Sequence, residues 1–247
     1  MAGGSYRSSH DDNSFEVFLE SWLIRQEQYL NELIVAQETF DEEAQESDIK
    51  DLISRVVAHY QEYYEEKSRM THRNVLRVFS PTWFSPLERS ILWITGFNPG
   101  LAFNLVTESI KDLNEHQVES INWLRHEAKF QERSLTEELA NIQESVAAPP
   151  LVELAHRVGM QVIYTDNINE EVDENIDLLK TALENVVMDA DRLRTTTAER
   201  VVGLLNPLQC LKFLSAAAQL QLRVRMMGMQ REAERQQQQD NENSNGC

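Results

Sequence analysis

Hydrophobic residues recur at intervals of three and four along most of the chain, which is the pattern of amphipathic α-helices. The stretches that show it are residues 15–34, 49–64, 118–146, 172–193 and 208–225. A run typical of a strand occurs at 162–164, and it is too short and isolated to form a sheet. The chain is therefore predicted to be all-α, a bundle of long antiparallel helices.

The segment 85–106 differs from the long helices because it is short, apolar and interrupted by turn residues. Ser85 stands at an N-cap position, Pro86 at the first helical position, and Glu88 three residues after the cap. The serine oxygen can accept from an unpaired backbone N–H, and the glutamate can bind the N–H of the cap residue. This spacing predicts a capping box and a helix start.

The uncharged run 91–94 is expected to extend this short helix, and Gly96 is expected to end it in the left-handed conformation. Asn98-Pro99 repeats the signal of a polar cap followed by proline. We therefore predict a tight helix–turn–helix elbow that is buried among the longer helices.

Two later helix starts carry a similar signal: Asn114 is followed by Gln117, and Asn206-Pro207 by Gln209. The predicted organisation is a disordered leader (1–13), one helical domain (14–230) and a disordered tail rich in Gln and Asn (231–247).

The heptad spacing of apolar residues at 172–193 leaves two arrangements open, a helix of the bundle or a two-stranded coiled coil. We favour the bundle because three heptads are marginal for an independent coiled coil.

The composition excludes several classes of protein. With 8 Gly, 6 Pro and 41% hydrophobic residues, the chain has few turn residues and enough apolar material for a sizeable core. The net charge of −18 opposes contact with a nucleic-acid backbone. Two cysteines, Cys210 and Cys247, imply no disulfide framework. Because no signal peptide or membrane span is present, we expect an intracellular protein that is neither secreted nor membrane-bound.

No group of residues typical of an enzyme is found: there is no glycine-rich phosphate loop, and no Ser or Cys nucleophile has a base nearby. A di-iron bundle needs two Glu-x-x-His units, whereas Glu153-Leu154-Ala155-His156 is the single one in the chain. His59 is expected to be a core or helix-end residue that forms hydrogen bonds, rather than a metal ligand. We therefore expect a non-enzymatic protein without a metal or cofactor.

The aromatic residues suggest where the surface lies. Trp22, Trp93 and Trp123 lie in helical patterns and are expected in the core. Trp83 and Phe84 lie between two prolines and are candidates for a knob that docks a partner. The alternative is that these two residues close the end of the bundle.

The last helix combines basic residues with Met and Leu, as calmodulin targets do, which makes Arg223 and Arg225 candidate partner contacts. The alternative, which we favour, is a closing helix whose arginines pair with acidic residues of the same chain.

Several blocks agree with one family pattern, in the same order along the chain. They are residues 15–23, Gln26, 30–33, 57–64, 86–89, Trp93, Gly96-Phe97, 113–117 and 193–214. Together they resemble the plant Delay-of-Germination (seed dormancy control) domain family. The residues that match the motifs of this family are Trp22, Gln26, Leu33, His59, Tyr60, Pro86, Glu88, Arg89, Trp93, Gly96 and Phe97.

The resemblance implies a stand-alone plant regulatory protein of the nucleus and cytoplasm. It would act through protein–protein interactions in seed dormancy or maturation and abscisic-acid signalling. The partners implied are signalling or transcription-regulating proteins, such as phosphatases or bZIP-type factors. Haem has been associated with histidines in the final helix of family members; residues 208–231 contain none, so haem is not expected here.

Three alternatives remain open. The same domain forms the C-terminal half of TGACG-binding leucine-zipper transcription factors, which raises the alternative of a DNA-associated transcription factor. The domain starts about a dozen residues into this chain, with no basic region before it, so we do not expect direct nucleic-acid binding. The second alternative is a pollen-aperture factor of the Inaperturate Pollen branch. A ligand-binding sensor, the third, requires a buried cavity among the helices.

Overall fold

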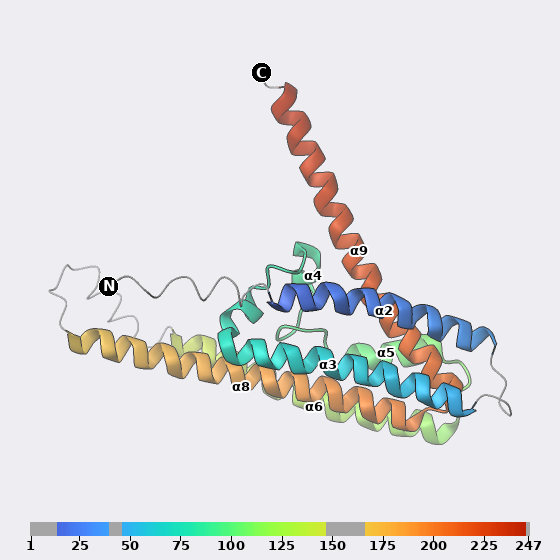
Figure 1. Ribbon diagram of the computed structural model, residues 1–247. Helices are drawn as coiled ribbons and strands as arrows, with labels where there is room; N and C mark the ends of the chain where they lie inside the picture. Colours follow the sequence, from blue (N-terminus) through green and yellow to red (C-terminus); the bar gives the residue numbers. More distant parts are fainter. Residues whose placement is uncertain (1–13, 40–45, 147–165, 246–247) are drawn as a thin grey trace.

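The computed structural model describes residues 14–39, 46–146 and 166–245 of the chain (Figure 1). Its helices are α2 (Ser14–Glu38), α3 (Glu46–Phe79), α4 (Pro86–Ser90), α5 (Gly100–Ser109), α6 (Glu115–Val146), α8 (Asp166–Leu204) and α9 (Pro207–Asn245). Within these ranges there is no β-strand, and the isolated bridge between Trp93 and Gly96 is the one pairing of that kind. The predicted all-α fold is confirmed.

The helices α3, α8 and α6 lie side by side along the long axis of the body (Figure 1). Helix α2 lies against α3, and α9 packs on α2, α3, α4 and α5 before its C-terminal part leaves the body. Helix α8 buries Leu183, Val186 and Ala190 in contact with neighbours of the same chain. The stretch 172–193 is thus part of a bundle, as we favoured.

The buried hydrophobic side chains form one large cluster and one small one. Leu33, Phe103, Val186 and Leu211 are fully enclosed in the large cluster, which joins residues of every helix except α4. The small cluster consists of Phe15, Leu19 and Trp22 at the start of α2. The large cluster joins helices that are distant in sequence, and the small one packs against Tyr60, Tyr63 and Met70 of α3, so the described helices form one body.

The capping boxes predicted at Ser85, Asn114 and Asn206 are present. Ser85 Oγ accepts from the backbone N–H of Glu88 at 3.2 Å, and the Glu88 carboxylate accepts from the N–H of Ser85 at 2.8 Å. The same reciprocal pairs of hydrogen bonds join Asn114 with Gln117 and Asn206 with Gln209. These local signals therefore place the starts of α4, α6 and α9 correctly.

The second helix of the elbow, α5, begins at Gly100 directly after Asn98-Pro99, as predicted, but the predicted end of the first helix was wrong. Helix α4 ends at Ser90, and the residues with positive φ are Ile94 (39°) and Thr95 (59°) rather than Gly96. The glycine is needed for a different reason, since a Cβ atom at Gly96 would lie 2.8 Å from Cζ of Arg194. An arginine almost a hundred residues away thus determines this turn, and the local sequence carries no sign of it.

The prediction for the tryptophans holds for one of three. Trp22 is fully buried, whereas Trp123 is 59% exposed and lies beneath the guanidinium of Arg200, 5.0 Å from Cζ to the ring centre. Trp93 is half-buried in the turn after α4, where its Nε1 donates to Thr136 Oγ1 at 3.1 Å. Helical spacing alone did not reveal that position 123 faces outward on α6.

The C-terminal segment also differs from the prediction. Helix α9 continues to Asn245 and projects from the body, where a disordered tail from 231 was expected (Figure 1). Gln, Glu and Arg are good helix formers, so this polar segment can extend a helix without burying apolar surface. The leader 1–13, the Glu153–His156 unit and the run 162–164 lie outside the described residues.

Candidate functional site

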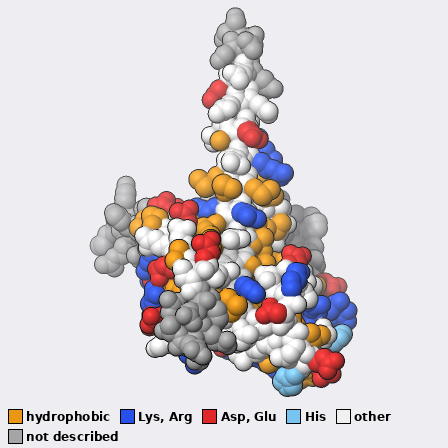
Figure 2. Space-filling model, turned by 90° about the vertical axis from the view of Figure 1, so that its right-hand side faces the viewer, with side chains coloured by type: hydrophobic (Ala, Val, Ile, Leu, Met, Phe, Trp, Pro, Cys, Tyr) orange, Lys and Arg blue, Asp and Glu red, His pale blue; other side chains and the backbone are white. Residues whose placement is uncertain are grey.

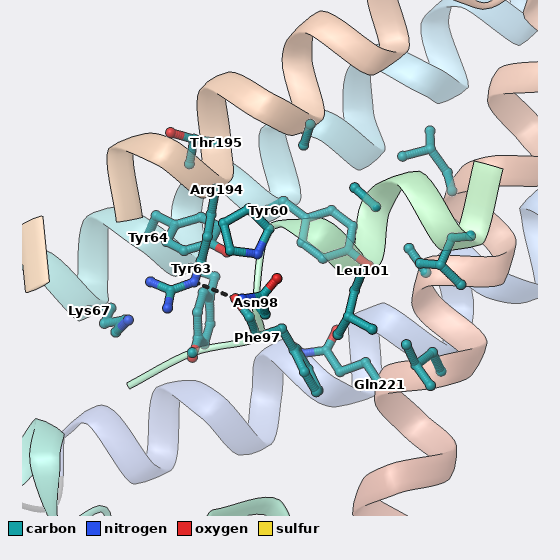
Figure 3. Close-up of a pocket in the computed structure, with 18 of the residues that line it drawn as sticks. Tyr60, Tyr63, Tyr64, Lys67, Phe97, Asn98, Leu101, Arg194, Thr195 and Gln221 are labelled. Atoms are coloured by element: carbon teal, nitrogen blue, oxygen red, sulfur yellow. Dashed lines mark hydrogen bonds between the residues drawn. The ribbon is translucent and has the colours of Figure 1, made fainter. Parts of the chain in front are cut away.

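A cavity of about 350 Å³ lies between α2, α3, α5, α8, α9 and the turn after α4. Its walls are mostly apolar and aromatic, with Trp22, Phe97 and Leu101 among them. Figure 3 shows the phenol rings of Tyr60, Tyr63 and Tyr64 along the α3 side of this space. Volumes of about 300–1,000 Å³ are typical of small-molecule sites.

The amphipathic pattern of α3 places four polar-tipped side chains on the cavity. Tyr60, Tyr63, Tyr64 and Lys67 are separated by three and four residues and therefore lie on one face of the helix. Burial raises the pKa of Tyr60 to about 12 and raises the pKa values of Tyr63 and Tyr64 as well. All three hydroxyls are therefore protonated at neutral pH and can donate hydrogen bonds.

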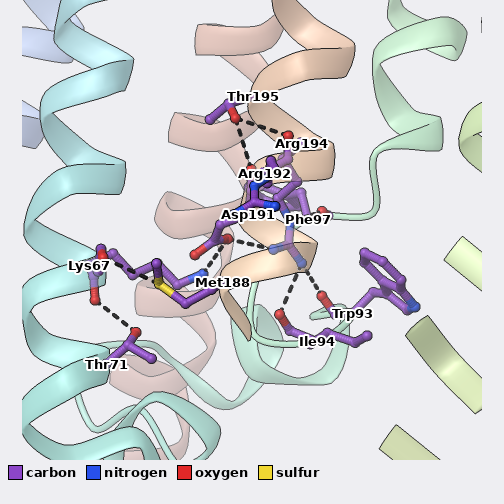
Figure 4. Close-up of polar contacts among 11 residues, drawn as sticks. Lys67, Thr71, Trp93, Ile94, Phe97, Met188, Asp191, Arg192, Arg194 and Thr195 are labelled. Carbon is purple, nitrogen blue, oxygen red and sulfur yellow. Dashed lines mark hydrogen bonds and ion pairs between the residues drawn. The ribbon is translucent and has the colours of Figure 1, made fainter. Parts of the chain in front are cut away.

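A buried cluster of charges lies at one end of the cavity (Figure 4). Lys67 Nζ and Arg194 Nη1 both contact Asp191 Oδ1, at 2.8 and 2.6 Å. All three residues are less than 9% exposed. Burial lowers the pKa of Lys67 to about 8, and the neighbouring Asp191 opposes this shift. The lysine is therefore mostly protonated at pH 7, so the cluster holds two cations and one carboxylate.

Arg194 also holds the turn that forms one wall of the cavity. Its Nε donates to the carbonyl of Phe97 at 2.7 Å, and its Nη2 donates to the carbonyls of Trp93 and Ile94, the latter at 3.0 Å. Its guanidinium carbon also lies 5.2 Å from the centre of the Trp93 ring. The planar, multivalent donor set of arginine suits this arrangement. One side chain of α8 thus fixes the wall formed by residues 93–97.

Trp22 of α2, which lines the cavity, packs against His59 of α3. The Trp22 ring stacks on His59 at 4.3 Å, and its Nε1 donates to the backbone carbonyl of His59 at 2.8 Å. Burial lowers the pKa of His59 to about 4, with a smaller contribution from Arg25. Gln26 Nε2 donates to the Tyr60 hydroxyl at 2.5 Å and to Gln221 Oε1 at 3.1 Å. These contacts join α2 and α3 to α9.

Of the predicted partner contacts, Arg225, Trp83 and Phe84 contact other parts of the same chain, whereas Arg223 is exposed. Arg225 Nη1 lies 3.5 Å from Glu88 Oε1 and donates to the carbonyl of Trp83 at 3.3 Å, so it contributes to the contact between α9 and the segment around α4. Arg223 is exposed on α9. Trp83 is half-buried, and its ring meets the edge of Phe15 at 5.1 Å, beside Phe84 at the end of the bundle. Whether any of these residues binds a partner remains a prediction.

The residues that match the family motifs mostly surround the cavity or support its walls. Trp22, Tyr60, Glu88, Gly96 and Phe97 line it, and Gln26, His59 and Trp93 contact those that do. Leu33 belongs to the main core, Pro86 begins α4, and Arg89 is exposed.

Lys67 and Asp191 were missed, and Tyr63 and Arg194 were noticed only within the family blocks 57–64 and 193–214. The sequence feature that could have identified Lys67 and Asp191 is a charged residue on or beside the apolar face of a helix. Lys67 continues the inward face of Tyr60 and Tyr64, and Asp191 directly follows buried Ala190.

Two further properties concern the described residues alone. They contain no group of three or more His, Cys, Asp or Glu side chains able to hold a metal ion. Their helices include no apolar run of the length required to span a bilayer.

The site defines a class of protein, an all-α bundle with a partly open cavity, one wall of which is a turn held by an arginine. The seed dormancy control (DOG1) family model matches residues 29–108, from α2 to α5. Protein ZW2 of Arabidopsis thaliana is 36% identical over 83% of this chain and 92% of its own length. Protein RESPONSE TO ABA AND SALT 1 of the same plant is 33% identical over 86% of this chain and 94% of its own length. The chain belongs to the seed dormancy control (DOG1) family.

Transcription factors share the domain. Transcription factor TGA10 of Arabidopsis thaliana is 27% identical over 83% of this chain, which corresponds to 44% of the length of TGA10. The resemblance to both groups of proteins that we inferred from the sequence is confirmed.

Proposed function

We propose that this protein is a non-enzymatic regulator that acts in abscisic-acid-linked seed or stress responses through contacts with other proteins. One observation carries the proposal: Met226, Met227 and Met229 are 46–57% exposed on α9, next to exposed Arg223. Figure 2 shows hydrophobic and basic side chains gathered where α9 leaves the body. Exposed apolar groups of this kind mark interaction sites, and methionine adapts to varied partner surfaces.

The partner chemistry that fits this surface is an apolar groove with an acidic rim. Signalling or transcription-regulating proteins, among them phosphatases, bZIP-type factors and calmodulin, are the candidates that we propose. The relative named for its response to ABA and salt supports the physiological setting, and the TGA transcription factors support action in the nucleus. Action in the cytoplasm is part of the proposal.

The experiment compares two sets of three substitutions in the full chain. In the first set Met226, Met227 and Met229 are changed to Gln. In the control set Val17, Ile24 and Val35, which are 57–61% exposed on α2, are changed to Gln. Both variants and the unmodified chain are used as bait in extracts of maturing seeds, and bound proteins are identified by mass spectrometry.

The expected result is a set of proteins that the unmodified chain and the α2 variant retain and the α9 variant loses. The proposal is contradicted if the α9 variant and the α2 variant bind the same proteins in equal amounts. It is also contradicted if the unmodified chain binds no protein from the extract. Titration of the full chain with calcium-loaded calmodulin tests that candidate separately, and no binding at micromolar concentration removes it.

A further inference from the structure

The cavity has a polar end and an apolar end. Lys67, Tyr63, Tyr64 and Arg194 lie together on one side of it, and Leu101 lies on the other (Figure 3). The rings of Tyr63 and Tyr64 are 5.3 Å apart. Apolar side chains from α5 and α9, such as Leu105 and Phe213, also line the cavity. Gln221, which Figure 3 shows on the Leu101 side, already accepts a hydrogen bond from Gln26. This arrangement is that of a site for a molecule with one polar group on a hydrophobic body.

The polar end keeps donors that the described residues do not use. Lys67 carries three N–H donors and gives one to Asp191. The hydroxyls of Tyr63 and Tyr64 make no hydrogen bond within the ranges 14–39, 46–146 and 166–245. Neither hydroxyl oxygen is among the buried polar atoms that lack a partner, so both are accessible from the cavity. A ligand that brings acceptor oxygens to this end can accept these hydrogen bonds in place of water.

The charge at this end is also unbalanced. Lys67 and Arg194 carry two positive charges against the one negative charge of Asp191. The other acids on the cavity are engaged elsewhere or exposed: Glu88 pairs with Arg225, and Glu199 is exposed on α8. A buried excess charge is costly unless it is paired. The expected polar group of the ligand is therefore an anion.

We propose that this cavity binds a small amphipathic organic anion. Its acid group lies against Lys67 and the hydroxyls of Tyr63 and Tyr64, and its apolar body extends between α5 and α9. Water alone does not suit the space because most of its lining is apolar. The turn 93–97, held by Arg194, forms one wall, so that a bound molecule contacts α3, α8, α9 and this turn together.

The test uses two fluorescent probes that differ only in the acid group. 1-Anilinonaphthalene-8-sulfonate carries a sulfonate on an aromatic body, and N-phenyl-1-naphthylamine has the same body without it. The full chain is titrated with each. We expect one sulfonate probe per chain, bound at least tenfold more tightly than the neutral probe. Equal affinity for the two probes overturns the assignment of an anionic ligand.

Substitutions locate the binding site. Ala217 lines the cavity on α9, so Ala217→Phe fills it, and we expect the sulfonate probe to lose at least tenfold in affinity. Ala58→Phe makes the same change at an exposed position of α3 and should leave the affinity unchanged. Unchanged binding by a folded Ala217→Phe variant overturns the proposal, as does equal loss in both variants.

The role of the hydroxyls is tested without altering the ion pair. The double variant Tyr63→Phe, Tyr64→Phe keeps the volume of both rings, and we expect several-fold weaker binding of the sulfonate probe with no change for the neutral one. The variant with Met226, Met227 and Met229 changed to Gln serves as a second control. If that variant loses the probe, the probe binds the α9 surface and the cavity assignment is wrong, whatever the outcome for protein partners.

Discussion

Gln117 and Gln209 hydrogen-bond to each other, and in doing so they join the starts of α6 and α9. Gln117 Nε2 donates to Gln209 Oε1 at 2.8 Å and to the carbonyl of Leu204 at 2.8 Å. Gln209 Nε2 donates to the carbonyl of Asp112 at 3.2 Å. Each glutamine also closes the capping box of its own helix, and both are buried. Two local helix signals are thereby combined into one tertiary contact.

The first prediction concerns this pair. Gln209→Ala leaves the N–H of Asn206 and the carbonyl of Asp112 without their partner, so we expect the free energy of unfolding to fall by about 2 kcal/mol. Gln230→Ala, at an exposed position of α9, should change it by less than about 0.5 kcal/mol. Urea denaturation measures both. Strict additivity with Gln117→Ala in a double-mutant cycle would show that the contact is not energetically coupled.

Replacement of two glycines by alanine should change the free energy of unfolding in opposite directions. At Gly96 a Cβ atom meets the Arg194 guanidinium at 2.8 Å, so Gly96→Ala should lower the free energy of unfolding by about 1–3 kcal/mol. At Gly203, in α8, nothing lies within 4 Å of the added atom, and Gly203→Ala should raise it by up to about 1 kcal/mol through helix propensity. Thermal unfolding followed by circular dichroism compares them, and a stabilising Gly96→Ala contradicts the role assigned to Arg194.

The contact between α9 and the cap of α4 depends on Gly228. A Cβ atom there would lie 2.0 Å from Ser85 Oγ, so Gly228→Ala should destabilise the protein by about 1–3 kcal/mol although alanine favours the helix. Adding Ser85→Gly removes the obstructing side chain and keeps a residue tolerated at an N-cap. We expect the second substitution to restore most of the lost stability. Failure of this rescue in urea denaturation argues against the close approach.

Acid should destabilise the protein through His59. Its pKa is about 4 in the folded protein and 6.5 in the unfolded chain. Between these values the unfolded chain takes up a proton that the folded protein does not, so stability is full above pH 6.5 and falls as the pH is lowered. This group should contribute a loss of about 2 kcal/mol at pH 5. The measurement is the difference in unfolding free energy between pH 7.5 and pH 5, which should be smaller in His59→Gln than in the unmodified protein.

Direct binding to DNA is not expected. The net charge of −18 repels the phosphate backbone, and phosphate contacts supply most non-specific affinity. A mobility-shift experiment with the purified chain and duplex DNA at low salt should therefore show no complex. A shift that weakens steeply as salt is raised contradicts this expectation and would support the alternative of a DNA-associated transcription factor.

Much of the candidate site was visible in the sequence as separate parts. The stripe of Tyr60 and Tyr64 was recognised as the inward face of a helix, and the Ser85–Glu88 capping box was placed correctly. The charged cluster of Lys67, Asp191 and Arg194 was not predicted from the sequence. Lys67 and Asp191 are 124 positions apart, and neither has a local signal that identifies its partner. A lone charge on an apolar stripe shows that a buried partner is needed without showing where it lies.

The amino-acid sequence by itself determined the helical class, the starts of α4, α6 and α9, and most inward faces, because caps and periodicity depend on neighbours within a few residues. Only the tertiary structure decided the turn at residues 93–97, the outward position of Trp123 and the cavity itself. Each of these depends on side chains that meet across helices, as Arg194 meets Phe97. Such contacts depend on how the helices pack, which no short stretch of sequence specifies.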